Sequence, residues 1–405
     1  MKPIVRAGRM KPVHSDIRGP LFVEAMKRQK QGIDILKLNT GNPATFGFGL
    51  PDSIKNALMK HMQDGVGYCD FKGMPQARQA ICDYETSKGI NGITSDDVFI
   101  GNGVSEVVSF ALTPLLNDGD EVLVPSPSYS LWGNSVYLED GKPVFYTCDE
   151  QANWYPDIQD IRSKITDKTK AIVIINPNNP TGVLYPKELL LEIIQIARES
   201  GLLIFADEIY DRLVMDGKQH ISLASLTEDV PVITLNGLSK SHCLCGYRCG
   251  WMVISGPREL TEDYRQGIIQ LTSLRLCANT MAQIVIPAAL DDMETPASMV
   301  RPGGRIYEQR EATVRELEKI DGLSFVKNDA AFYVFPKLDV KKFNITNDKQ
   351  FAHDLLDATN ILLVPGSGFD WKDPDHFRIV MLPQADILSD AIRRMGTFLD
   401  GYKQK

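Results

Sequence analysis

The chain has 405 residues, of which 43% are hydrophobic and 24% are charged, the composition of an ordinary globular protein with room for two domains. Its formal net charge of −8 and the lack of a basic run argue against a nucleic-acid binder, and no apolar stretch approaches the roughly 18 residues that span a bilayer. The seven cysteines are odd in number and scattered, and residues 1–20 lack the apolar core of a secretory signal. We therefore expect a cytoplasmic protein without a disulfide framework.

The first fifty residues are irregular and rich in Pro and Gly, and we expect residues 1–50 to pack with the C-terminal part. From residue 51, short apolar runs alternate with helix-like segments such as 185–201, which has Pro near its start and Gly at its end. Most of these runs are continuously apolar, which is typical of strands buried on both faces. The predicted strands are 97–101, 121–125, 142–147, 171–176, 202–207, 231–236 and 250–255.

Alternating strands and helices predict an α/β fold over residues 51–290, a large domain with a mostly parallel central sheet sandwiched by helices. The C-terminal third has a different pattern. Residues 301–320 predict a long amphipathic helix, and shorter strands are expected at 330–336 and 377–382. Residues 291–405 should therefore form, with the N-terminal segment, a smaller α+β domain.

Ligands bind at the carboxyl ends of the strands in open α/β sheets, so the residues that follow each apolar run are the first candidates for a site. Five strand ends carry polar groups or glycine turns of different kinds, which a purely structural sheet would not need. In chain order these residues are Gly103, Val104 and Ser105, then Tyr129, then Asn179, then Asp207 and Tyr210, then Ser239 and Lys240.

Several of these residues also have a purely structural explanation. The turn "GNGVSE" is a common kind of glycine turn, although the free N–H groups of a helix start also attract an anion. Asp207 would serve equally as a helix N-cap or as a carboxylate paired with a cationic ring nitrogen. Asn179 lies in "NPNNPTG", where Asn and Pro are favoured by turn geometry alone.

Lys240 is harder to explain as a solvated surface charge, because it lies at the predicted sheet edge between small residues. Desolvation lowers the pKa of a lysine, so we expect a neutral amine that can attack a carbonyl. Arg248, eight residues later, can hold an anion beside it. A lysine for a Schiff base, a phosphate cradle and a carboxylate for a pyridinium nitrogen together describe a pyridoxal phosphate site.

The loop after Lys240 also offers a possible zinc site, since His242, Cys243, Cys245 and Cys249 lie within it. Structural zinc sites usually combine two closely spaced ligand pairs separated by a spacer, and this spacing lacks that pattern. We therefore expect no metal, and we interpret the cysteines as small thiols packed around a buried turn.

The motifs "NPNNPTG", "DEIYDRL", "LSK" and "GYRCGW" resemble the class I/II aminotransferases of pyridoxal phosphate fold type I, and the resemblance covers nearly the whole chain. Further segments, among them "DIRGP", "GYCDFKG" and "FRIVMLP", are similar to bacterial members that act on glutamate and pyruvate, the alanine aminotransferases. The resemblance implies transamination between L-alanine and 2-oxoglutarate to give pyruvate and L-glutamate, as part of alanine biosynthesis.

The resemblance also implies roles for the cofactor-binding residues. Lys240 would carry the cofactor as an internal aldimine and would then move a proton between the substrate and the cofactor. Asp207 would pair with the pyridine nitrogen, Asn179 and Tyr210 would bind the 3′-oxygen, and Tyr129 would stack on the ring. The phosphate ligands would be Gly103, Val104, Ser105, Ser239, Arg248 and, from the neighbouring subunit of a homodimer with shared active sites, Tyr68.

On the substrate side, the resemblance implies that Arg378 binds the α-carboxylate bidentately, assisted by Gly41 and Asn179. From the sequence alone, Arg378 could equally form a surface salt bridge worth about 0–1 kcal/mol. Arg18, in "SDIRGP", is our candidate for the second carboxylate of glutamate, because the N-terminal segment could fold over the site.

Some residues depart from the family pattern. Gly237 stands where many relatives have a serine that binds phosphate, and Cys243 and Cys245 stand where close relatives have basic or aliphatic residues. Two other functions stay open, a β-lyase of the same fold and a regulator that has kept the fold without catalysis. The regulator would be expected to have lost Lys240 or Arg378. A dinucleotide-binding reductase is disfavoured because no G-x-G-x-x-G follows the first strand of the α/β domain.

Overall fold

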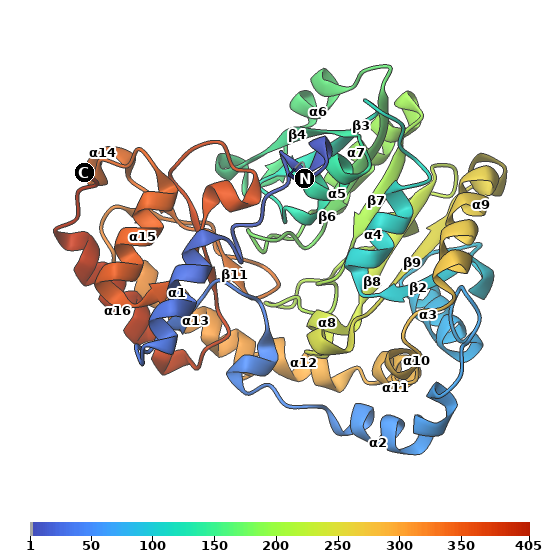
Figure 1. Cartoon of the computed structure of the whole chain (residues 1–405), viewed down its shortest axis with the longest axis horizontal. Helices are drawn as coiled ribbons and strands as arrows, with labels where there is room; N and C mark the ends of the chain where they lie inside the picture. The colour runs from blue at the N-terminus through green and yellow to red at the C-terminus, as the bar shows by residue number, and fades with distance from the viewer. Residues whose placement is uncertain (1–2) are drawn as a thin grey trace.

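The computed structural model of the protein describes residues 3–405 and has an eight-stranded sheet at its centre (Figure 1). Neighbouring strands run parallel, except that β9 is antiparallel to β2 and β8, and β5 is antiparallel to β4. The order across the sheet is β2 (Val98–Asn102), β9 (Cys249–Ser255), β8 (Val232–Gly237), β7 (Leu203–Asp207), β6 (Thr169–Ile175), β3 (Glu121–Ser126), β4 (Lys142–Asp149) and β5 (Tyr155–Pro156). All seven predicted strands are present, and the predicted fold class is confirmed.

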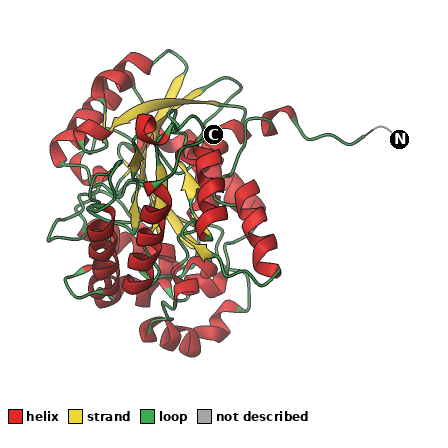
Figure 2. Cartoon of the chain, turned by 90° about the vertical axis from the view of Figure 1, so that its left-hand side faces the viewer, coloured by secondary structure: helices red, strands yellow, loops and turns green. Residues whose placement is uncertain are grey.

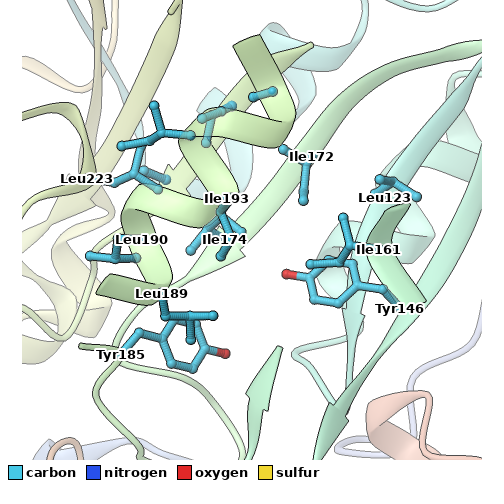
Figure 3. Packing of buried hydrophobic residues seen from close by; sticks show 14 of the residues in the cluster. Leu123, Tyr146, Ile161, Ile172, Ile174, Tyr185, Leu189, Leu190, Ile193 and Leu223 are labelled. Atoms are coloured by element: carbon cyan, nitrogen blue, oxygen red, sulfur yellow. The ribbon is translucent and has the colours of Figure 1, made fainter. Parts of the chain in front are cut away.

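Helices cover both faces of this sheet because its strands are apolar on both sides. Along β6, Ile172 and Ile174 face one layer, whereas Val173 and Ile175 face the other. Figure 3 shows the first layer, where Ile193 and its neighbours on one helix lie over Ile174. The helices on this face are α6 (Ile158–Lys164) and α7 (Lys187–Ser200), and those on the opposite face are α4 (Val104–Leu112), α5 (Leu131–Leu138) and α9 (Arg258–Arg275).

A third group of helices packs beside β2 and β9, where a separate apolar cluster includes Trp251 and Ile100. This group contains α2 (Asp52–His61), α3 (Pro75–Ser87), α10 (Thr280–Gln283) and α11 (Ile286–Asp291). The short helix α8 (Leu238–Ser241) follows β8 and packs against this cluster through Leu238.

The C-terminal part of the chain, drawn in orange and red in Figure 1, has its own apolar cluster. It is built on the small sheet β11 (Tyr333–Val334), β15 (Phe377–Val380) and β14 (Val364–Pro365), and a separate pair joins β10 (Leu323–Ser324) to β12 (Lys337–Leu338). Its helices are α12 (Glu294–Val300), α13 (Arg305–Leu317), α14 (Val340–Phe343), α15 (Asp348–Thr359) and α16 (Ala385–Asp400). The predicted helix 301–320 is therefore shorter than expected, because Pro302, Gly303 and Gly304 form a turn before it.

The N-terminal segment is more regular than the sequence suggested. It contains α1 (Pro20–Lys30), and β1 (Leu36–Lys37) pairs in parallel with β13 (Ile361–Leu362) of the C-terminal part. Residues 3–7, which precede the short helix η1 (Gly8–Met10), project from the body of the molecule (Figure 2). The exact domain limits, near residues 50 and 290, stay a prediction. Within residues 3–405, no helix combines the length and apolar character needed to cross a bilayer.

Candidate active site

The candidate residues gather where several strands of the large sheet end at the same edge. Asp207 is the last residue of β7, and Lys240 lies on α8 directly after β8. Arg248 immediately precedes β9. Because β9 is antiparallel to its neighbours, its first residue lies at the edge where theirs end, so Arg248 reaches the same place from the opposite chain direction.

Lys240 reaches from this edge toward the N-terminal segment. Its Nζ donates a hydrogen bond to the carbonyl oxygen of Gly41 at 3.0 Å and lies 4.0 Å from Sγ of Cys245. Burial lowers the Lys240 pKa, but the acidic hydroxyl of Tyr333, the thiol of Cys245 and the hydroxyl of Tyr129 raise it, and the net direction is upward. The expectation of a lowered Lys240 pKa is therefore wrong for the chain alone, because its surroundings favour the cation.

Asp207 is a buried carboxylate with a single strong side-chain partner. The indole N–H of Trp132 donates to Oδ2 of Asp207 at 3.1 Å, and the backbone N–H of Ile209 approaches Oδ1 at 3.4 Å. Burial raises the Asp207 pKa to about 6, although the Trp132 hydrogen bond works in the opposite direction. A positive group placed against Asp207 would relieve this cost of burial, which fits the predicted pairing with a cationic ring nitrogen.

Two further contacts join the sheet edge to the C-terminal part. The hydroxyls of Tyr210 and Tyr333 are 2.8 Å apart, and Nη1 of Arg378 donates to Oδ1 of Asn179 at 2.9 Å. Arg378 also donates through Nη2 to the carbonyl oxygen of Asn39. Residues from the N-terminal segment, the sheet edge and the C-terminal part therefore contact one another, and Tyr333 and Arg378 lie close enough to Lys240 to influence its pKa.

Arg378 is a buried cation without an acidic partner. It is 1% exposed, and none of the ion pairs among residues 3–405 includes it. Its guanidinium lies between the rings of Tyr333 and Phe369, 4.5 Å and 4.6 Å from their centroids, and its Nε has no hydrogen-bond partner among the described residues. The alternative of a surface salt bridge is wrong for Arg378. A buried, uncompensated guanidinium with an open donor indicates a site for a carboxylate.

Glycines and Arg248 form the corner where the phosphate was predicted. Gly103 has a φ of +85°, and a Cβ on it would lie 2.4 Å from Nη2 of Arg248. A Cβ on Gly237 would lie 2.6 Å from the carbonyl oxygen of Cys249, and one on Gly250 would lie 2.4 Å from the backbone nitrogen of Val104. The departure at Gly237 thus has a packing reason, because a serine there would collide with β9. Backbone N–H groups at the start of α4 and Arg248 are left to bind an anion.

The side chains of the cysteine-rich loop have separate partners. Cys243 Sγ contacts Sδ of Met299 at 3.8 Å, and Cys245 donates to the carbonyl oxygen of Ser239 at 3.0 Å. His242 is buried, lies 3.2 Å from the carbonyl oxygen of Asp292 through Nε2, and has a pKa lowered by burial to about 4. The thiols pack around a buried turn, as the sequence suggested.

A buried ionic network supports the strand ends from below. Lys88 Nζ lies 2.7 Å from Glu208 and 3.2 Å from Asp211. Asp211 accepts a hydrogen bond from Nδ2 of Asn236 at 2.7 Å, and Oδ1 of Asn236 accepts one from the N–H of Gly237. With His220, the two carboxylates place possible metal-ligand atoms within 4.8 Å of one another. The Lys88 ammonium, however, already supplies the positive charge that a metal would bring.

Two predicted residues form no side-chain hydrogen bond or ion pair with the others within the described chain. Tyr68 is 83% exposed, and Arg18 is exposed at the turn before α1. The segment beside Arg18 is nevertheless tied to the site, because Nδ2 of Asn39 donates to the carbonyl oxygen of Ile17 at 2.8 Å and the Asn39 carbonyl accepts from Arg378. Tyr129, on the turn after β3, lies close enough to raise the pKa of Arg378.

The same segment is held down by a charged cluster that we call the N-terminal clasp, formed by His14, Asp16, Asp370 and Lys349. Nε2 of His14 lies 3.1 Å from Asp370, its Nδ1 lies 3.6 Å from Asp16, and Lys349 lies 3.2 Å from Asp16. Hydrogen bonds that the imidazole donates to two carboxylates, first Asp16 and then Asp370, raise the His14 pKa to about 9. The clasp therefore contains an imidazolium at neutral pH.

The sequence analysis missed Trp132 and Tyr333. Tyr333 lies in the predicted strand 330–336 and Trp132 in a segment for which no element was predicted, yet each carries a buried polar atom that needs a partner. That requirement is a usable signal, because a buried indole N–H or phenol at a sheet edge points to a neighbouring acceptor or donor.

Comparison with known proteins gives a consistent result. The pattern of the family described as aminotransferase class I and II matches residues 33–392. The glutamate–pyruvate aminotransferase AlaA of Haemophilus influenzae is 50% identical over 404 residues, covering 100% of both chains. A crystal structure of an aminotransferase from Escherichia coli has a TM-score of 0.98 at 47% identity over 100% of both chains. Alanine aminotransferase from Pyrococcus furiosus has a TM-score of 0.92 at 41% identity, covering 98% of this chain and 100% of that chain.

Proposed function

The chain belongs to the class I and II aminotransferase family, and from this premise we propose that it transfers an amino group between L-alanine and 2-oxoglutarate, giving pyruvate and L-glutamate. The observation that carries the proposal is Arg378, a buried guanidinium beside Asn179 with no carboxylate of its own. Both substrates are α-carboxylates, which a guanidinium can hold through two parallel hydrogen bonds. Relatives named for glutamate, pyruvate and alanine support this choice of substrates.

The residues present fit pyridoxal phosphate as cofactor. Asp207 has a raised pKa that a pyridinium nitrogen would lower. Gly103 has no side chain, so the Arg248 guanidinium can lie against it at the start of α4, where backbone N–H groups favour an anion. We assign the phosphate to Gly103, Val104, Ser105, Ser239 and Arg248. When bound, pyridoxal phosphate supplies an aldehyde that joins an amine and a ring that withdraws electrons from the α-carbon.

Each residue then has a defined task. Lys240 would hold the cofactor through Nζ and would take the proton from the substrate α-carbon as general base. Arg378 and Asn179 would fix the α-carboxylate, so that the bond facing Lys240 is Cα–H and deprotonation is favoured over loss of the carboxylate. Asp207 would keep the ring nitrogen protonated, Tyr210 would donate to the 3′-oxygen, and Tyr129 would cover the ring.

The second carboxylate of glutamate needs another cation, and we propose Arg18. It lies in the segment that Asn39 ties to Arg378, and it forms no ion pair within residues 3–405. Arg18→Ala should weaken the glutamate half-reaction and leave the alanine half-reaction nearly unchanged. Equal rates for both half-reactions in the variant and the parent would eliminate Arg18 from this role.

We propose a homodimer with shared sites. Exposed apolar side chains gather on and around the segment η3 (Met62–Gly65) and at the C-terminal end of α9. Nη2 of Arg275, the last residue of α9, donates to the Phe71 carbonyl oxygen and joins the two parts. The exposed side chains include Met59, Met62, Val66, Tyr68, Leu274 and Leu276. A second copy would cover them and bring the partner's phenol to the phosphate.

Mixed dimers test this arrangement. Lys240→Ala and Tyr68→Ala chains, each impaired alone, should regain part of the parental activity when unfolded together and refolded as a mixture, because one site of a mixed dimer carries neither substitution. No recovery in dimers shown by mass to be mixed would mean that Tyr68 serves its own chain.

All seven cysteines are free, which supports our proposal that the enzyme works in the reducing cytoplasm.

The reaction itself is tested with single amino acids. Purified protein loaded with pyridoxal phosphate should change its absorbance to that of the pyridoxamine form with alanine or glutamate, and pyruvate or 2-oxoglutarate should reverse the change. A β-lyase would instead release pyruvate and ammonia from a cysteine-type substrate without an oxo acid. That second outcome, or a protein that stays colourless with the cofactor, would overturn the proposed function.

A further inference from the structure

We propose that Tyr333 is a positioning residue for this reaction, whose hydroxyl orients the phenol of Tyr210 toward the cofactor and whose ring holds the Arg378 guanidinium. The inference rests on the proposed function, and it concerns a residue outside the set that the family motifs identify. Tyr333 lies on β11 and is buried, so neither contact is replaced by water.

Three observations place Tyr333 between the two halves of the site. Its hydroxyl lies 2.8 Å from that of Tyr210, and its ring centroid lies 4.5 Å from Cζ of Arg378. A Cβ on Gly41 would lie 2.3 Å from the Tyr333 hydroxyl oxygen. Position 41 therefore has no room for a side chain, because Tyr333 occupies the space beside it. The carbonyl of the same glycine accepts the hydrogen bond from Lys240.

The number of protons on the two phenols decides which hydroxyl donates in the hydrogen bond between them. A phenol has one proton to donate, and its oxygen can also accept. Burial raises the Tyr210 pKa, so Tyr210 keeps its proton across the neutral range. Tyr210 can donate that proton to the 3′-oxygen of a bound cofactor only if the contact with Tyr333 is one in which Tyr333 donates and Tyr210 accepts. The Tyr333 hydroxyl thereby directs the Tyr210 proton to the ring.

The ring of Tyr333 has a separate effect. Arg378 is desolvated and lacks a carboxylate partner, and the two aromatic faces on either side of its guanidinium are its main compensation. The tyrosine ring keeps the guanidinium in the plane in which its donors face Asn179 and the substrate space. Substitutions that remove only the hydroxyl should therefore differ from those that remove the ring.

Tyr333→Phe in the holoenzyme tests the hydroxyl. Without the donated hydrogen bond, Tyr210 is a weaker donor to the 3′-oxygen, and the pH midpoint of the absorbance change of the Lys240-bound cofactor should rise by about 0.5 to 1 unit. The Kd of alanine, measured from the same spectra, should change little because the ring stays on Arg378. Tyr333→Leu should weaken that binding roughly 5- to 30-fold.

A double-substitution cycle separates positioning from a general structural effect. Tyr333→Phe should shift the midpoint in the parent and leave it unchanged in a Tyr210→Phe background, since the hydroxyl acts through Tyr210. Tyr146→Phe is the matched control, because its buried phenol donates to the Val173 carbonyl inside the sheet at 2.7 Å, away from the site. It should leave the midpoint where it is.

Fluorotyrosine at position 333 keeps every contact and strengthens the donor, so it should move the midpoint downward even if the phenylalanine variant folds poorly. An unchanged midpoint in Tyr333→Phe or with fluorotyrosine, or equal shifts with and without Tyr210, would overturn the inference. The proposed function fails by a different observation, a parent protein that gives no cofactor absorbance at all.

Discussion

The two sides of the site differ in how the chain builds them. On the cofactor side, Asp207, Tyr210, Asn179 and Lys240 follow the ends of neighbouring strands of one sheet, and the buried network around Lys88 supports them. On the substrate side, Arg378 comes from a small sheet far along the chain, and the backbone carbonyl that accepts its hydrogen bond belongs to Asn39 of the N-terminal segment. The comparison shows that a sheet edge fixes one half locally, whereas the other half exists only after distant segments have packed.

The site and the buried network that supports it also differ in charge. Around Lys88, cation and carboxylates neutralise one another inside the protein. Arg378 and Asp207 instead remain without ionic partners, one cationic and one with a raised pKa. Uncompensated buried charge is costly for folding, so its presence at these two positions marks the groups that await ligands of opposite charge.

Lys240→Ala should have the largest effect, and it should abolish function on the cofactor side while leaving the fold intact. We expect turnover to fall by roughly 10⁴-fold or more, since the general base and the covalent anchor are lost together. Borohydride reduction followed by mass measurement should find the cofactor joined to the parent chain and not to the variant. Lys240→Arg keeps the cation as a control and should be equally inactive. Substantial turnover in either variant would contradict the assignment.

Arg378→Lys should damage the substrate side selectively. A lysine keeps the charge but loses the planar pair of donors, and we expect kcat/KM for alanine to fall by about 30- to 1000-fold. The absorbance of the bound cofactor and its pH midpoint should stay close to those of the parent. If the spectrum changes as much as the kinetics, the two sides are not separable in the way that their construction suggests.

Asp207→Asn should reveal the stability cost of a buried ligand group. The Asp207 pKa is raised from its ordinary value of 3.8 to about 6, so the folded apoenzyme binds a proton that the unfolded chain releases between these pH values. The penalty is absent below about pH 4 and complete above about pH 6, where it reaches about 3 kcal/mol. Denaturant unfolding of the apoenzyme should therefore find the variant more stable at pH 8 and equal to the parent near pH 4. A variant less stable than the parent at pH 8 would contradict this account.

His14→Ala should have the smallest effect, because the clasp is partly exposed to solvent. The His14 pKa is raised to about 9, so its contribution is complete below its unfolded value of 6.5 and is lost as the pH rises through about 9. After screening, we expect about 1 kcal/mol or less at neutral pH. Limited proteolysis before α1 should be faster in the variant at pH 7 and equal to the parent at pH 10. His353→Ala, whose histidine pairs only with a neighbouring turn of α15, is the control.

The sequence predicted the cofactor side well because its logic is local. A continuous apolar run that ends in Asp207 or in the "NGLSK" turn predicts a strand, and it also predicts that the residue at the end of the run lies at the edge of the sheet. The substrate side was less accessible. Arg378 could not be distinguished from a surface residue without the family resemblance, since its burial depends on Tyr333 of β11 and Phe369 of the short helix η8 (Gly366–Phe369).

The errors have physical causes as well. The Lys240 pKa was expected to be lowered by burial, but the direction depends on hydroxyl and thiol groups that only the fold brings together. The helix α1 was missed because its sequence lies between irregular stretches and its packing partners are in α15 and β13. Trp132 was not identified as a site residue, although its indole N–H is the side-chain hydrogen-bond partner of Asp207.

The glycines at the phosphate corner have a consequence for anyone who would redesign this enzyme. At Gly237, Gly250 and Gly103, a neighbouring atom already occupies the space that a Cβ on the glycine would need. A hydroxyl copied from a relative into position 237 would push β9 outward and displace Arg248, the cation already serving that corner. Tighter binding of the cofactor therefore requires several positions to be replaced together, because a single substitution at one of these glycines first disturbs the packing around Arg248.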